Sequence, residues 1–155
     1  MSELLGIARF KMHEGKLDEF KRLSAQAMEI VRTKGSGTLQ YDTYFNDDES
    51  ECVVIERYRD SEAAMEHAAN LAELSAAILE TVSVVHGEVL GEPRAELRAN
   101  LADSDVPQLF TPYESIRDDA WGDSGAMSPH ARGSRIERDP LDVRFPSSRG
   151  RDLNP

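Results

Sequence analysis

Hydrophobic and polar residues alternate along four short segments of the chain, the pattern of strands that bury one face. These segments are residues 4–12, 38–45, 52–59 and 83–90. Two longer segments, residues 16–34 and 61–81, instead carry apolar residues at three- and four-residue steps, which predicts amphipathic helices. Gly35 and Gly37 are expected to end the first helix, and Asp60 and Ser61 supply oxygen atoms that favour the start of the second.

The order strand, helix, strand, strand, helix, strand predicts an α+β fold of the ferredoxin-like, or split βαβ, kind. Four strands would form one antiparallel sheet with both helices on a single face. The polar residues 46–50 form a turn of hairpin length, so the second and third strands should pair. The apolar face of the second strand is expected to carry Leu39, Tyr41, Thr43 and Phe45.

The sheet face without helices would remain partly apolar, and a two-layer domain cannot hide such a face from water. We therefore expect a second copy to pack sheet against sheet, giving a homodimer. Residues 1–92 are predicted to form this domain, and residues 93–117 a short helix and an extended arm along the partner subunit. Residues 118–155 are rich in Gly, Ser, Pro, Asp and Arg, which predicts a disordered tail.

The charge and cysteine content exclude several classes of partner. The chain has a net charge of −11, and an acidic surface repels nucleic acid and anionic membranes. No run approaches the roughly 20 apolar residues that cross a bilayer. The single cysteine, Cys52, cannot form an intrachain disulfide and fits a reducing compartment, so we expect a cytoplasmic protein.

A carboxylate and an imidazole are expected to meet over the sheet. Glu56 lies on the same strand face as Cys52, Val54 and Tyr58, and His67 lies in an apolar helical stripe with Ala64 and Leu71. Both residues also have a purely structural interpretation. His67 can be a core imidazole satisfied by one hydrogen bond, and Glu56 can form an ion pair or a backbone hydrogen bond in a half-buried site. No His, Cys, Asp and Glu set has metal-ligand spacing, so no metal site is predicted.

Residues 37–45, 51–70 and the strand end at 91–93 resemble the antibiotic biosynthesis monooxygenase (ABM) domain superfamily, over about residues 1–92. Members show an aromatic strand, a Glu-x-aromatic strand, a polar helix start and a histidine in the next helix. The positions here are Tyr41, Glu56, Tyr58, Ser61 and His67. The resemblance implies a dimeric α/β barrel built from two sheets face to face.

The resemblance also implies a cofactor-independent monooxygenase that oxidises a quinol or phenolic small molecule with dioxygen. His67 would be the base and Glu56 would orient it, while Tyr41, Tyr58 and Asn70 would contact the substrate. Tyr58 stands where many members have tryptophan, and the tyrosines can equally serve sheet packing. Asn70 can instead be a left-handed helix terminus. The alternative function is a non-catalytic dimeric module that binds an aromatic ligand or haem.

Overall fold

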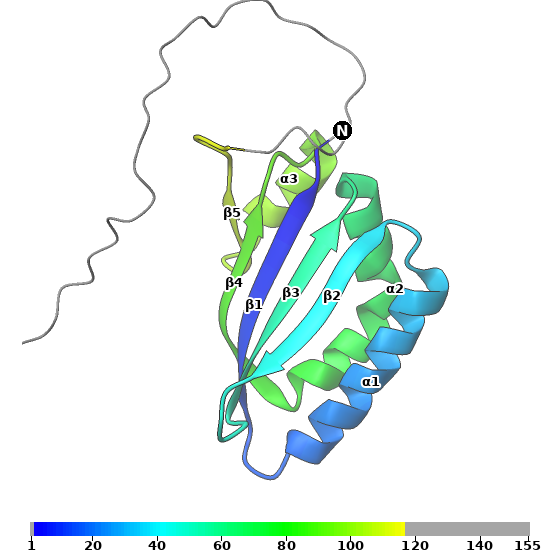
Figure 1. Ribbon diagram of the computed structural model, residues 1–155, viewed down its shortest axis with the longest axis vertical. Coiled ribbons are helices and arrows are strands. Elements are labelled where there is room, and N and C mark those ends of the chain that lie inside the picture. Colours follow the sequence, from blue (N-terminus) through cyan, green and yellow to red (C-terminus); the bar gives the residue numbers. More distant parts are fainter. Residues whose placement is uncertain (1, 117–155) are drawn as a thin grey trace, which may run out of the picture. The chain divides into compact units, whose positions relative to one another are not determined.

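The computed structural model describes residues 2–116 of the 155-residue chain, so the predicted tail at residues 118–155 lies outside the described residues. Its strands are β1 (Leu4–Met12), β2 (Thr38–Phe45), β3 (Glu51–Tyr58), β4 (Val82–Leu90) and β5 (Gln108–Phe110), and its helices are α1 (Leu17–Lys34), α2 (Ser61–Leu79) and α3 (Ala95–Ala102). The strands form one open sheet in the order β2-β3-β1-β4-β5 (Figure 1).

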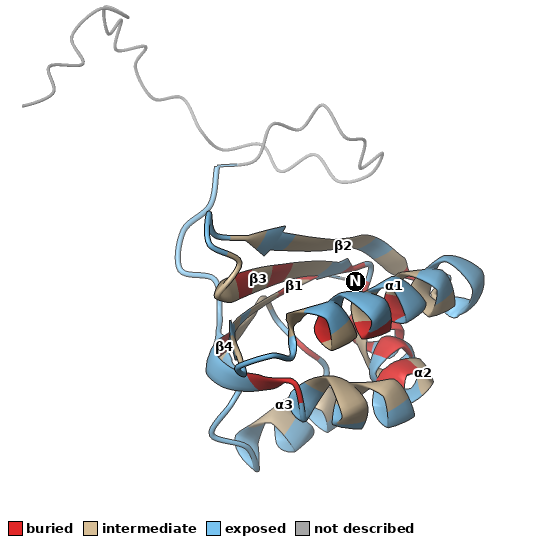
Figure 2. Ribbon diagram, turned by 90° about the horizontal axis from the view of Figure 1, so that it is seen from below, coloured by how far each residue is buried: buried red, intermediate tan, exposed pale blue. Residues whose placement is uncertain are grey.

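The predicted order of the first six elements is confirmed, as is the α+β, ferredoxin-like class. β1 lies between β3 and β4 and is antiparallel to both, and β2 pairs with β3 in the predicted hairpin. Helices α1 and α2 cover one face of this sheet, and Figure 2 shows buried residues where the two helices face it. None of the helices between residues 2 and 116 is long and apolar enough to span a membrane.

A fifth strand corrects the prediction of a wholly antiparallel, four-stranded sheet. Gln108–Phe110 runs parallel to β4, with Glu88 opposite Gln108 and Leu90 opposite Phe110. After α3 the chain returns to the free edge of β4, whose backbone groups would otherwise lack partners. Gly87 permits the close approach, because a Cβ at this position would lie 2.9 Å from Cγ1 of Val106. The sheet is therefore mixed, and residues that were predicted as an arm contribute a strand.

Two clusters of buried side chains hold the helices to the sheet. The first contains Leu4, Tyr58 and Ala63, and it lies where β3 passes into α2. The second, at the other end of α2, contains Phe20, Cys52 and Val82, with partly buried Phe10, Met12, Phe45 and Ile78 around it. Both clusters use the strand parity that the sequence predicts, because residues 52, 54, 56 and 58 of β3 all face the helices.

Helix α2 begins and continues as a single unbroken element. The Asp60 carboxylate accepts a hydrogen bond of 2.9 Å from the backbone N–H of Ala63, which confirms the predicted helix start. The helix runs on past Asn70 to Leu79. Asn70 therefore does not terminate the helix, and this alternative is wrong. The uninterrupted helix presents one continuous stripe of side chains to the sheet.

Candidate functional site

A cavity of about 290 Å³ lies between the sheet and helices α1 and α2. Tyr41, Glu56, Tyr58 and His67 contribute its polar groups. Apolar side chains line most of the remainder, namely Phe10, Phe20, Val54, Ala64, Ala68, Leu71, Ile78 and Leu79, with hydroxyl groups from Ser24, Thr43 and Ser75. Ala68 and Leu79 are exposed, which puts the opening of the cavity along α2.

Strand β3 places Glu56 and Tyr58 side by side on the cavity face. The Tyr58 hydroxyl donates a hydrogen bond of 2.6 Å to Oε2 of Glu56. Gly6 of β1 lies directly opposite Glu56, and a Cβ added to Gly6 would come within 3.1 Å of the same Oε2 atom. The missing side chain at Gly6 therefore leaves the space in which the carboxylate lies.

A β-bulge in β2 brings two further residues to this face. The register shifts between Thr38 and Gln40, so that Thr38 lies opposite Tyr58 and Tyr41 lies opposite Glu56. In a regular strand, residues three apart would face opposite sides, and the extra residue at the bulge removes this difference. Leu39 takes the extra position and is 49% exposed, which corrects its predicted place on the apolar face.

His67 is held among these groups. Its side chain is 7% exposed, with Nε2 3.7 Å from Oε1 of Glu56 and Nδ1 3.5 Å from Oγ1 of Thr38. The rings of Tyr41 and Tyr58 approach it edge-on, with centroid distances of 5.2 and 5.1 Å. Both contacts of the ring nitrogens are longer than an ordinary hydrogen bond, so a ligand hydroxyl can compete for either nitrogen.

The surroundings keep both tyrosines protonated. Burial, and next to it the negative charge of Glu56, raise the pKa of the Tyr41 and Tyr58 hydroxyls well above the ordinary value. Both hydroxyls therefore remain hydrogen-bond donors at neutral pH. Tyr58 donates to Glu56, whereas the Tyr41 hydroxyl makes no hydrogen bond to another residue within 2–116. Tyr41 can thus donate to an oxygen atom of a bound molecule.

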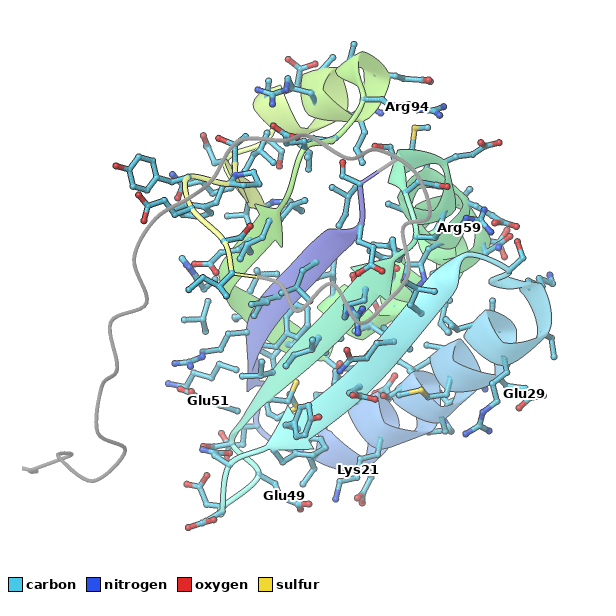
Figure 3. The ribbon with its side chains drawn as sticks, turned by 45° about the horizontal axis from the view of Figure 1, so that its top comes forward. Lys21, Glu29, Glu49, Glu51, Arg59 and Arg94 are labelled. Carbon is cyan, nitrogen blue, oxygen red and sulfur yellow. The ribbon has the colours of Figure 1, made fainter. Side chains whose placement is uncertain are left out.

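The positively charged side chains of residues 2–116 lie outside the lining of this cavity. Lys21 pairs with Glu49 at 2.7 Å, and Arg59 pairs with Asp60 at 3.1 Å, while Figure 3 shows both labelled cations and Arg94 on the outside of the fold. In the part of the chain that the structure describes, no Lys or Arg lines the cavity. That part also lacks any group of three His, Cys, Asp or Glu side chains that could hold a metal ion.

The structure brings four of the five predicted site residues together. Glu56, His67, Tyr41 and Tyr58 share the polar end of the cavity, whereas Asn70 does not line it. Sequence reasoning missed Gly6 and Thr38. A glycine between alternating apolar residues of β1 marks a close approach to a neighbour and could have signalled the first. The bulge that turns Thr38 inward leaves no comparable trace in the sequence.

The fold and this buried acid–base cluster define an α+β domain with a small-molecule cavity between sheet and helices. The sequence model described as antibiotic biosynthesis monooxygenase (ABM) matches residues 5–79. This match supports the resemblance to the ABM superfamily that the sequence predicted, over the part of the domain that holds the cavity. No curated protein sequence matches the chain significantly.

Two solved structures illustrate the similarity. MupZ from Pseudomonas fluorescens is 27% identical, with a TM-score of 0.65 and a match that covers 76% of this chain and 96% of MupZ. SnoaB, a cofactor-independent oxygenase from Streptomyces nogalater, shares the fold at 17% identity and a TM-score of 0.51, over 57% of this chain and 91% of SnoaB. The MupZ match is too long to fit within residues 1–92, so the similarity extends into the segment that holds α3 and β5.

Proposed function

We propose that this domain is a cofactor-independent monooxygenase that oxidises a quinol or phenolic molecule with dioxygen in the cavity. The observation that carries the proposal is the mostly apolar cavity in which Glu56, His67 and two tyrosyl hydroxyls meet. The match to the ABM family model supports the reaction class, as does the description of SnoaB as a cofactor-independent oxygenase.

The reaction needs little from the protein beyond a base, a hydrogen-bond donor and a site without bulk water. His67 accepts the proton of the substrate hydroxyl, and the carboxylate of Glu56 stabilises the imidazolium that results. Tyr41 donates to an oxygen of the substrate, and Tyr58 holds Glu56 in place. Asn70 stays a predicted contact without support from the cavity lining.

The atoms and electrons balance without a further reagent. The phenolate gives one electron to dioxygen, and the superoxide and phenoxyl radical combine at a ring carbon. The resulting peroxide loses water as its O–O bond breaks and the ring carbon gives up its hydrogen. One oxygen atom thus becomes a ring carbonyl, and the other leaves as water with two hydrogens of the substrate.

Oxygen consumption with a panel of hydroquinones, without added metal or flavin, tests the proposal. His67→Ala should lower kcat/KM by about 10²- to 10⁴-fold, the usual range for loss of a general base. A neighbouring pair of alanines on α2 supplies a matched control, because both are exposed and only Ala68 lines the cavity. Ala68→Phe should therefore abolish turnover, and Ala69→Phe should leave it unchanged. No turnover across the panel would remove the enzymatic function.

A non-catalytic module for an aromatic ligand is the second candidate, since the edge-on rings of Tyr41 and Tyr58 around His67 also suit ring binding. It predicts binding of hydroquinones without oxygen consumption. Haem is less well supported as its ligand, because both nitrogens of His67 face protein oxygen atoms. Titration with haem, followed by its absorbance band in the wild type and in His67→Ala, separates this case.

We also propose that two copies pair through the sheet face opposite α1 and α2. This face carries Ile7, Val53 and Val85 beside the charged Arg9 and Glu88, and Val85 is 52% exposed. An apolar centre with a charged border is the usual composition of a protein interface. Residues 106–116, with exposed Val106, Phe110, Tyr113 and Ile116, supply further apolar surface for such a contact.

A further inference from the structure

We infer that the cavity takes an uncharged, amphipathic ligand: a hydroxylated aromatic ring at its polar end, extended by an apolar chain toward the second half of α2. The inference rests on the proposed function for the choice of a hydroxylated ring. It goes further by naming the substituent that the cavity accepts, the end at which this substituent lies and the charge that the site rejects.

The cavity has two chemically different ends because α2 runs back along β3. Ala63, near the start of α2, packs against Tyr58, and Ile78, near its end, packs beside Cys52. The groups that hydrogen-bond a ring hydroxyl, Glu56 and His67, therefore lie at the first of these ends. His67 and Ile78 are about 17 Å apart along the helix axis, from a rise of about 1.5 Å per residue. The cavity is thus elongated along α2.

The second end offers apolar surface and few polar groups. Phe10, Phe20, Ile78 and Leu79 line it, and the Ser24 and Ser75 hydroxyls lie on the two helices beside them. An alkyl or prenyl chain gains free energy by leaving water at such a surface, whereas a second polar ring would leave its oxygen atoms without strong partners. The volume of about 290 Å³ is at the small end of ligand pockets, which fits one ring with a chain better than a fused polycycle.

The charge of the lining excludes anionic ligands. Glu56 is the carboxylate of the site, and within residues 2–116 no Lys or Arg lines the cavity to balance a second negative charge. A sulfonate, phosphate or carboxylate on the ligand would lose its hydration and also face Glu56. Uncharged ligands escape both costs, so the site should discriminate by charge before it discriminates by ring pattern.

Calorimetric titration of the full-length protein under anaerobic conditions tests the inference, because binding is then measured without turnover. The ligands are hydroquinone, its 2-butyl and 2-hexyl derivatives, and hydroquinonesulfonate. Affinity should rise by up to about fourfold for each methylene that the cavity buries. Hydroquinonesulfonate should bind at least about tenfold more weakly than hydroquinone. In Glu56→Gln this difference should shrink.

A matched pair on α2 locates the chain end. Ser75 lines the cavity, and the next residue, Ala76, is exposed and does not line it. Ser75→Phe should lower the affinity for the hexyl derivative by a larger factor than the affinity for hydroquinone, and so remove the gain from butyl to hexyl, whereas Ala76→Phe should change neither affinity. An affinity independent of chain length, or equal binding of the sulfonate, overturns the inference. If the ligands bind as expected but no oxygen is consumed in air, the oxygenase function is overturned, whereas the inferred ligand class is retained.

Discussion

At the scale of single residues, the burial of Tyr58 next to Glu56 makes the stability of the fold depend on pH. The raised pKa of the Tyr58 hydroxyl, caused first by burial and then by the Glu56 charge, means that the folded state keeps its proton at a pH where the unfolded chain has lost it. Stability from this tyrosine is therefore fully present below about pH 10, the ordinary tyrosine pKa, and is lost as the pH rises further.

The slope of stability against pH measures this effect. Between pH 10 and 11 the unfolded chain binds fewer protons, so each such tyrosine should lower the free energy of unfolding by about 1 kcal/mol over this interval. Urea unfolding of the wild type and of Tyr58→Phe should show a smaller slope in the variant. Tyr113→Phe serves as a control, because Tyr113 is 93% exposed. Equal slopes in the wild type and Tyr58→Phe would contradict the assignment.

Gly6 offers a separate test of the carboxylate position. A methyl group at this residue would come within 3.1 Å of Glu56 Oε2, the far end of a side chain that can rotate away. Gly6→Ala should therefore change stability by less than about 1 kcal/mol, yet lower turnover by moving the carboxylate from Tyr58. In a double-mutant cycle with Glu56→Gln, the two effects on kcat/KM should not add. Additive effects would show that Gly6 does not act through Glu56.

At the scale of elements, the start of α2 is stabilised by the carboxylate of Asp60, the residue just before the helix. The pKa of Asp60 is lowered by the hydrogen bond from the Ala63 backbone N–H and by Arg59, so this carboxylate stabilises the fold above its ordinary pKa and loses that effect as the pH falls below about 4. Asp60→Asn should lower the melting temperature at pH 7, and its difference from the wild type should shrink as the pH falls below about 4. A constant difference between the two would point to packing instead of charge.

The elements also show where sequence reasoning succeeded and where it stopped. Alternation in β3 placed Glu56 and Tyr58 on the helix side because the strand is regular, and helical spacing placed His67 above them. The same alternation gave the wrong face for Leu39, because the extra residue at the bulge in β2 moves the preceding residues to the opposite face of the sheet. β5 was missed because three residues carry too short a pattern, and its pairing depends on a distant glycine in β4.

At the scale of the whole molecule, the sheet face opposite the helices should decide the association state. Apolar surface that leaves water there contributes roughly 25 cal/mol per Å². Light scattering should return twice the monomer mass for the wild type. Val85→Glu, on this face, should give a monomer, and Ala72→Glu, on the exposed side of α2, should leave the dimer intact. A monomeric wild type would refute the pairing.

The segment after residue 116 allows a further test at this scale. Its sequence has too few apolar residues to offset an ordering cost of about 1–2 kcal/mol per residue. A chain truncated at Arg117 should therefore keep both the dimer mass and the melting temperature of the full chain. Loss of either would show that these residues bind the partner subunit.

The unbroken stripe of α2 separates the choice of ligand from the maintenance of the fold. Ala68 and Ser75 line the cavity without belonging to the buried core, and they lie on a helix whose backbone bonds are internal, whereas strand register depends on the sheet. Replacements at these two positions can narrow or polarise the cavity while every strand pairing persists. The domain can therefore diversify its ligands during evolution, or in directed evolution, through a few positions on one element.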